Sequence, residues 1–169
     1  PADRLAVRTQ VCRFSEPLIR EAILREVRRG GQVFFVHNRV KSIESLHEML
    51  TRLVPEVKVI VAHGQMRERE LEDTMLRFYR GDADVLLCTT IIESGLDVTN
   101  ANTILINNAN NFGLSDLHQM RGRVGRGNKK AFCYFITPPY HVMTAEARKR
   151  MEALEQYTEL GSGFNIAMK

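Results

Sequence analysis

The sequence predicts an α/β fold in which helices cover both faces of a mainly parallel β-sheet. Three observations support this prediction. Short apolar runs typical of buried strands recur along the chain, segments with helical periodicity separate them, and Gly or Pro follows the helical segments. Strands separated by helices of about 10 to 15 residues are typical of parallel sheets. A chain of 169 residues fits one domain and can bury a sizeable core.

Each element follows from a local pattern. Residues 5–14 alternate between apolar and polar side chains as a strand does, and Ser15 can cap the helix that follows. Gly30 and Gly31 close that helix. Apolar runs predict further strands at residues 33–36, 57–62, 85–88, 103–106 and 131–136. Apolar faces predict further helices over residues 43–53 and 71–78, and a last helix over residues 144–157.

The composition is that of an ordinary soluble globular protein, with 44% hydrophobic and 26% charged residues. A formal charge of +4 permits a polyanionic partner without requiring one, and residues 121–130 hold five basic side chains and no acidic one. No apolar run approaches the roughly 20 residues of a membrane-spanning helix, so we expect no membrane association. Cys12, Cys88 and Cys133 lie far apart in apolar runs, which predicts core thiols of a cytoplasmic protein and no metal site.

The most informative segment runs from His118 to Arg126 and places three arginines and two glycines within residues 121–126. Guanidinium groups are planar, permanently charged and rich in donors, which suits them to phosphate oxygens. Glycines let the backbone approach a polyanion closely. Arginines in this arrangement after Gln119 are what a phosphoryl-transfer site requires from a second protein surface. The alternative is an arginine-glycine loop that only coats nucleic acid.

Polar segments directly follow three of the predicted strands. They comprise His37 and Asn38, His63 and Gly64, and Thr89 and Thr90, the last pair leading to Gly95 and Asp97. Ligand sites in parallel α/β sheets lie beyond the carboxyl ends of the strands. Short polar donors along this edge suit a sugar-phosphate backbone. Each segment also has a simpler interpretation, as a helix cap, a tight turn or a pair of self-satisfied hydroxyls, and Asp97 can be an ordinary turn acid.

Several nucleotide-binding motifs do not occur in the sequence. There is no G-x-x-x-x-G-K-[ST] phosphate loop, and no G-x-G-x-x-G follows a predicted strand. No paired acids of the Walker B kind end a strand, so no magnesium site is predicted. We therefore expect that ATP with Mg²⁺ would be held mainly by another domain.

The arginine-rich segment and the strand-end segments together resemble the motifs of superfamily 2 helicases. Residues 119–126 are similar to motif VI, Q-x-x-G-R-x-G-R, and residues 89–97 are similar to motif V. Residues 37–40 and 63–66 resemble motifs IV and IVa. The order and spacing resemble the second of the two RecA-like motor domains, which implies a three-layer α/β fold.

Within the superfamily, three further segments resemble the bacterial transcription-repair coupling factors most closely: residues 31–38, 63–72 and 112–114. RecG-type helicases are the nearest relatives. Gly127 is more typical of the RecG type, and residues 107–110 replace a segment that is often charged in the family.

The resemblance covers essentially the whole chain and implies its organisation. Residues 1–140 would form the second RecA-like motor domain. Residues 141–169 would form the helical start of a translocation motif, truncated before that motif is complete. Because the chain begins with Pro1 rather than Met, we expect a fragment of a longer protein.

The resemblance also implies roles for individual residues. Arg123 and Arg126 would be arginine fingers that reach the γ-phosphate of ATP on the first motor domain, and Gln119 would help to position that site. Three residues would lie at the nucleotide, with Asp97 near the ribose or the fingers: Gly95, Asp97 and Gly122. The contacts to one DNA strand would be made by His37, Asn38, His63, Gly64, Thr89 and Thr90.

The implied parent protein is an ATP-dependent translocase on the backbone of double-stranded DNA. It would displace stalled RNA polymerase and couple transcription to nucleotide-excision repair, with RNA polymerase and excision-repair proteins as its partners. The isolated chain is expected not to hydrolyse ATP. Three alternatives stay open: the same domain of a RecG-type branched-DNA helicase, a non-catalytic nucleic-acid-binding module, and a small-molecule α/β enzyme.

Overall fold

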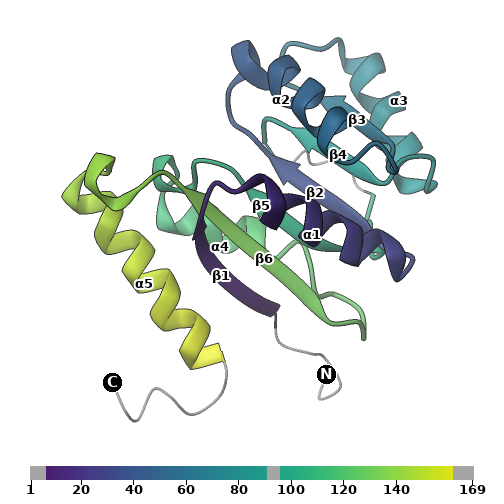
Figure 1. Cartoon of the computed structure of the whole chain (residues 1–169). Helices are drawn as coiled ribbons and strands as arrows, with labels where there is room; N and C mark the ends of the chain where they lie inside the picture. The colour runs from purple at the N-terminus through teal and green to yellow at the C-terminus, as the bar shows by residue number, and fades with distance from the viewer. Residues whose placement is uncertain (1–6, 91–95, 162–169) are drawn as a thin grey trace.

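The computed structural model describes residues 7–90 and 96–161. These residues form a six-stranded, all-parallel sheet in the order β1-β6-β5-β2-β4-β3 (Figure 1). The strands are β1 (Val7–Arg13), β2 (Gln32–Val36), β3 (Val59–Ala62), β4 (Val85–Cys88), β5 (Ala101–Ile106) and β6 (Ala131–Thr137). The predicted α/β class and parallel sheet are therefore confirmed.

The helices occupy the segments between the strands. They are α1 (Glu16–Arg28), α2 (Val40–Leu53), α3 (Glu68–Tyr79), α4 (Leu114–Arg121) and α5 (Ala145–Gly161), with short 3-10 turns η1 (Ala109–Asn111) and η2 (Tyr140–Val142). Ser15 caps α1 as predicted, because its side chain accepts a hydrogen bond from the Leu18 backbone N–H at 3.3 Å. Gly30 follows α1 with φ +87°, a backbone conformation that glycine adopts readily.

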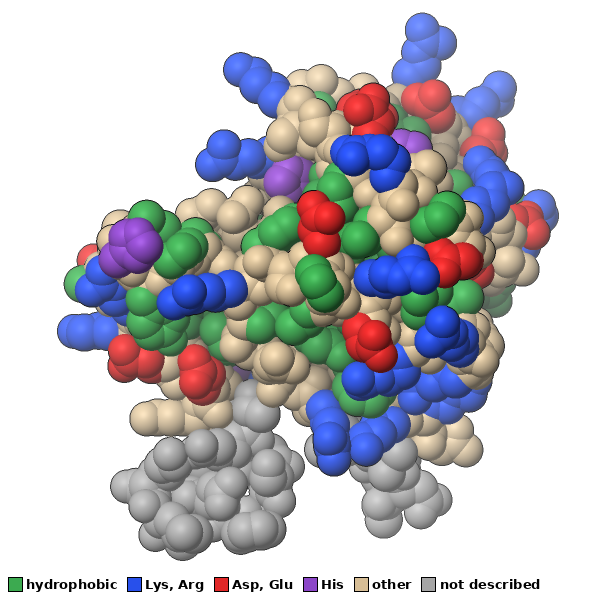
Figure 2. Space-filling model, in the orientation of Figure 1, with side chains coloured by type: hydrophobic (Ala, Val, Ile, Leu, Met, Phe, Trp, Pro, Cys, Tyr) green, Lys and Arg blue, Asp and Glu red, His purple; other side chains and the backbone are tan. Residues whose placement is uncertain are grey.

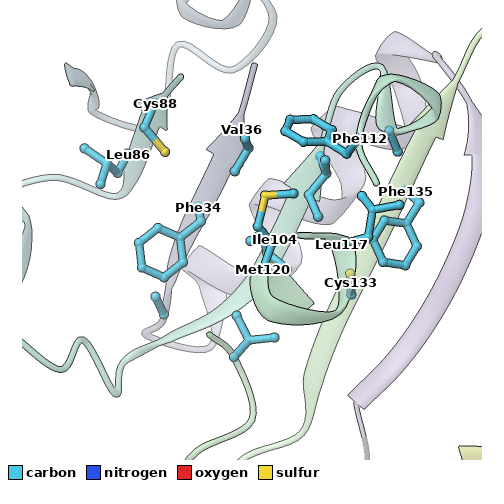
Figure 3. Packing of buried hydrophobic residues seen from close by; sticks show 14 of the residues in the cluster. Phe34, Val36, Leu86, Cys88, Ile104, Phe112, Leu117, Met120, Cys133 and Phe135 are labelled. Atoms are coloured by element: carbon cyan, nitrogen blue, oxygen red, sulfur yellow. The ribbon is translucent and has the colours of Figure 1, made fainter. Parts of the chain in front are cut away.

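Helices cover both faces of the sheet, and the alternation of side chains along the strands decides which face each residue supports. In β2, Val33 and Phe35 pack with α1 and α2, whereas Phe34 and Val36 pack with α3, α4 and α5. Figure 3 shows part of the second cluster, in which Phe34 lies among residues of neighbouring strands and of α4. This apolar packing on two faces explains why the strands read as continuous apolar runs.

The helix α5 packs against the rest of the domain. Its side chains Met151 and Leu154 are fully buried and belong to the same apolar cluster as α3 and α4. In Figure 1, α5 runs beside β1 at one end of the sheet. The helical part of the predicted tail therefore packs against the sheet.

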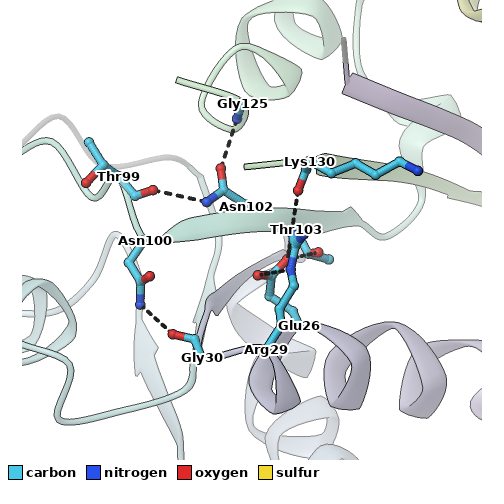
Figure 4. A network of polar contacts seen from close by, with 9 residues as sticks. All are labelled: Glu26, Arg29, Gly30, Thr99, Asn100, Asn102, Thr103, Gly125 and Lys130. Carbon is cyan, nitrogen blue, oxygen red and sulfur yellow. Dashed lines mark hydrogen bonds and ion pairs between the residues drawn. The ribbon is translucent and has the colours of Figure 1, made fainter. Parts of the chain in front are cut away.

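A buried ionic network joins α1 to β5 and β6 (Figure 4). The carboxylate of Glu26 has no exposed side-chain surface and accepts hydrogen bonds from Arg29 at 2.6 and 2.8 Å and from the Thr103 hydroxyl at 2.6 Å. Arg29 also donates to the backbone carbonyl of Lys130. A buried carboxylate requires such partners, because removing the charge from water is costly unless it is paired and hydrogen-bonded.

Two of the three cysteines lie in the core as predicted. Cys88 and Cys133 are buried, and Cys12 is partly buried. Burial raises the pKa of Cys88 to about 12 and that of Cys12 to about 11, so both thiols stay protonated at neutral pH. In the described part of the chain, no helix is both long enough and apolar enough to cross a membrane.

Candidate functional site

The strand order places the predicted DNA-contacting residues along one edge of the sheet. The neighbouring strands β3, β4 and β2 end at Ala62, Cys88 and Val36. The predicted pairs follow in the same spatial order: His63 with Gly64, Thr89 with Thr90, and His37 with Asn38. Because all these strands are parallel, the three pairs lie at the carboxyl edge.

The predicted DNA-contacting residues differ in exposure. Gly64, Thr90 and Asn38 are exposed at the edge. Thr89 and His37 are buried, with 5% and 6% of their surface exposed. His37 and Thr89 directly follow the buried ends of β2 and β4, whereas Asn38 and Thr90 lie one residue further from the strands. Gly64, Thr90 and Asn38 can therefore offer their surfaces to a ligand directly, and His63 is partly buried.

Both strand-end histidines, His63 and His37, form hydrogen bonds within the protein. The Nδ1 atom of His63 accepts a hydrogen bond from the Gln65 backbone N–H at 3.2 Å, which makes a tight turn after β3. The ring of His37 lies 2.7 Å from the Ser42 hydroxyl through Nε2 and 3.0 Å from the Asn107 amide nitrogen through Nδ1. Burial, and secondarily the charge of Arg39, lowers the pKa of His37.

A pocket of about 280 Å³ brings predicted DNA contacts and predicted catalytic residues together. Its lining consists of Asn38, Thr90, Phe112, Asp116, Gln119, Met120 and Arg123. Gln119 is exposed in the last turn of α4, and Arg123 follows two residues after the helix ends. The loop after α4 and the carboxyl ends of β2 and β4 therefore share one surface.

A second, smaller pocket lies against α3 and the sheet and is bordered by Arg123, Arg126 and Asp97. Arg126 Nη1 lies 2.9 Å from Asp97 Oδ1, and these side chains are 41% and 56% exposed. The ion pair is thus at the surface and can exchange for another partner. Arg123 is partly buried and lines both pockets.

The loop that carries Arg126 is shaped by one glycine and one buried amide. Gly125 has φ +80°, and a Cβ there would lie 2.8 Å from Val7 Cγ2. The backbone N–H of Gly125 donates to Asn102 Oδ1 at 3.2 Å, and Asn102 Nδ2 donates to the Thr99 carbonyl at 3.1 Å (Figure 4). Asn102 is only 1% exposed. One side chain therefore holds the Arg126 loop and the segment just after Asp97 together.

Asn102 is not among the residues that the sequence singles out. The strand begins two residues earlier than the predicted 103–106, so Asn102 and Thr103 are buried within β5. The available signal is an amide directly before an apolar run, where an unpaired polar group would be costly. Such a signal shows that a partner exists but not which loop provides it.

The remaining predicted residues occupy distinct positions. Gly122 caps α4 with φ −68° and is exposed beside Arg123. Gly95 lies outside the described residues. Arg121 donates from Nη2 to His118 Nδ1 at 2.9 Å, within the same helix, and lines neither pocket. Of the three clustered arginines, Arg123 and Arg126 are the ones at the pockets.

The fold and this arrangement agree with a comparison against known protein families. Residues 16–128 match the family described as the helicase conserved C-terminal domain. The chain belongs to this family, whose fold is RecA-like.

Within this family, the chain is similar to transcription-repair-coupling factors. The chain is 55% identical over 167 residues, 99% of its length, to the transcription-repair-coupling factor of Haemophilus influenzae. It is 50% identical over its full 169 residues to that of Bacillus subtilis. It spans 15% and 14% of the lengths of these two relatives. The predicted resemblance to coupling factors is confirmed.

The chain is also similar to solved helicase structures. The chain matches the structure of RecG bound to a three-way DNA junction with a TM-score of 0.79 and 38% identity, over 99% of this chain and 22% of that one. It also matches the yeast DEAD-box splicing factor Prp28 with a TM-score of 0.72 and 14% identity, over 96% of this chain and 34% of that one. The second match concerns the fold alone.

Proposed function

We propose that this chain is the second motor domain of an ATP-dependent double-stranded DNA translocase. In this proposal, the parent protein displaces stalled RNA polymerase and couples transcription to nucleotide-excision repair. The observation that carries the proposal is the convergence of Arg123, Arg126 and Asp97 on one pocket, beside a second pocket that adds Gln119, Asn38 and Thr90. Identities of 50% and 55% to coupling factors support the choice of parent.

The residues at the smaller pocket fit one side of a nucleotide site. Two guanidinium groups suit phosphate oxygens, and Arg126 is exposed enough to leave Asp97 for a stronger anion. Bound ATP with Mg²⁺, held mainly by the first motor domain of the parent, supplies the γ-phosphoryl group whose hydrolysis drives the cycle. Arg123 and Arg126 stabilise negative charge that develops there, an effect worth roughly 10³ to 10⁵ in rate.

The residues at the carboxyl edge fit a DNA backbone. Asn38 and Thr90 are exposed and neutral, and they can donate to phosphate oxygens without reading bases. A translocase requires contacts of this kind because it must hold any sequence. Domain closure around ATP and reopening after hydrolysis then shift the grip along the DNA.

The test replaces Arg126 with Ala in the full-length parent, with Arg69→Ala as the matched control because Arg69 is an exposed arginine on α3. The proposal expects DNA-stimulated ATPase activity to fall by about 10³-fold or more, with DNA affinity largely kept. The control should keep both. Loss of affinity with unchanged ATPase activity would instead identify a binding module, and activity independent of nucleic acid would identify a small-molecule enzyme.

A RecG-type branched-DNA helicase is the second candidate, favoured by the TM-score of 0.79 and 38% identity to RecG. The full-length parent separates the two candidates. Displacement of a stalled RNA polymerase from DNA supports the coupling factor, whereas unwinding of a branched junction without displacement supports the RecG type. The 169-residue chain alone should hydrolyse no ATP in either case.

A further inference from the structure

His37 ties together the carboxyl ends of three strands. Its backbone N–H donates to the Cys88 carbonyl at the end of β4, at 2.8 Å. The backbone N–H of Asn107, just after β5, donates to the Val36 carbonyl at the end of β2, also at 2.8 Å. These bonds fix the backbone on both sides of the His37 ring. The position of the imidazole is therefore set by the sheet.

The partners of the ring determine where its proton lies. The amide nitrogen of Asn107 can only donate, so His37 Nδ1 accepts at 3.0 Å. The proton of the neutral ring is then on Nε2, which donates to the Ser42 hydroxyl oxygen at 2.7 Å. Burial lowers the pKa of His37 and so favours the neutral ring that this arrangement needs.

The consequence falls on Ser42, in the first turn of α2. Its hydroxyl oxygen accepts from His37, so the hydroxyl hydrogen must turn elsewhere. The bond with His37 is the one that the described residues give the Ser42 hydroxyl, so its hydrogen can be offered to a ligand. Ser42 is partly buried and lies four residues after the exposed Asn38, in the helix that begins at the edge where the DNA backbone is proposed to bind.

Building on the proposed function, we propose that His37 is a positioning residue and that the Ser42 hydroxyl, oriented by His37 and Asn107, donates to a DNA phosphate oxygen. A ring that is 6% exposed and bonded at both nitrogens has no donor left for DNA. In this proposal, Ser42 in the first turn of α2 makes the DNA contact that the sequence suggests for His37.

The experiment is a double-mutant cycle in the full-length parent, with DNA affinity measured at several salt concentrations. Ser42→Ala should weaken DNA binding by about tenfold, as expected for one hydrogen bond to a charged group. The salt dependence should not change, since a hydroxyl neutralises no phosphate charge. Ser42→Thr keeps the hydroxyl and should restore affinity. Ser45→Ala, on the exposed side of the same helix, is the matched control and should change nothing.

His37→Phe should weaken binding about as much as Ser42→Ala, and the double variant should be no weaker than either single variant. Both single variants should keep the far-UV circular dichroism spectrum and a cooperative urea transition, which separates a loss of binding from a general loss of folding. Additive losses, or full affinity in Ser42→Ala, would overturn the positioning role. The proposed function fails separately, if the unaltered parent shows no DNA-stimulated ATPase activity.

Discussion

The two ends of β5 each carry a buried asparagine, and they hold different kinds of group. At the amino end, Asn102 holds the loop of Gly125, and the charged pair of Arg126 and Asp97 stays exposed beyond it. At the carboxyl end, Asn107 holds the ring of His37, which is itself buried. Asn102 supports the loop that presents a charged surface. Asn107 instead binds the His37 side chain, which would otherwise be able to reach the surface.

This difference separates residues that contact a ligand from residues that place those contacts. Exposed charged or hydroxyl groups can exchange their partners for a ligand at little cost. Buried amides and imidazoles cannot, because each lost hydrogen bond leaves an unsatisfied polar group. Burial as well as residue type therefore decides whether a polar residue at this edge contacts a ligand or positions another residue that does.

The largest effect on stability is expected at Gly125, which shapes the amino-end loop. Gly125→Ala forces a left-handed backbone and a close contact with Val7, and should lower the free energy of unfolding by about 2–4 kcal/mol. Gly30→Ala is the matched control, since Gly30 has φ +87° but a Cβ added there would meet no atom within 4 Å, and should cost only about 1–2 kcal/mol. Urea denaturation of the chain measures both. Equal losses would show that the contact with Val7 is unimportant.

Removing the amide itself should have the next largest effect. Asn102→Ala removes the hydrogen bond from the Gly125 N–H to Asn102 Oδ1 and should cost about 1–3 kcal/mol of unfolding free energy. In the full-length parent it should also lower ATPase activity while DNA affinity is kept. Asn100→Ala, which removes a bond from a more exposed amide to the Gly30 carbonyl, should cost about 0.5–1.5 kcal/mol and spare activity. A loss of DNA affinity in Asn102→Ala would contradict the separation of the two ends.

A smaller change in stability is expected from the exposed pair at the same end. Asp97→Ala should change the free energy of unfolding by less than about 1 kcal/mol, because both partners remain accessible to solvent. Urea denaturation at low and high salt checks this. A loss as large as that of Asn102→Ala would mean that the pair supports the fold.

The smallest expected effect is a pH dependence at the carboxyl end. The pKa of His37 is lowered from 6.5 by burial, so the unfolded chain binds a proton more readily than the folded one. Stability should therefore fall as the pH drops below about 6.5, towards the lowered pKa of the folded state. The measurement is the slope of unfolding free energy against pH, which His37→Phe should reduce.

His118 contributes a slope of the same sign, because burial and the neighbouring Arg121 lower its pKa. His118→Gln is thus the control that separates the two histidines. An unchanged slope in His37→Phe would show that the ring of His37 does not stay neutral in the folded chain.

The fold could be predicted from the sequence because burial of the sheet on both faces requires apolar runs in the strands and periodic apolar faces in the helices. Every predicted strand and helix is present, with starts that differ by a few residues, as at β3 and β5. The helix α4 is not among the predicted helices, because only Leu117 and Met120 of its side chains are buried and the apolar pattern is therefore weak.

The candidate site could be predicted only in part. Arg123, Arg126 and Asp97 share a pocket, as their motifs suggest, because charged residues in a fixed spacing form a recognisable pattern. Asn102 and Ser42 leave no such pattern. A single amide or hydroxyl has a meaning only through partners 23 residues away, as for Asn102 and Gly125, or on the next element, as for Ser42 and His37.

Arg123 borders both pockets, and this shared position has a thermodynamic consequence. If its guanidinium takes part in binding on each side, the affinities of the two pockets are linked, and occupation of one must alter the other by the same factor in both directions. Nucleotide binding at one pocket and DNA binding at the other would then be coupled through one side chain. This coupling would not require the sheet beneath Arg123 to move.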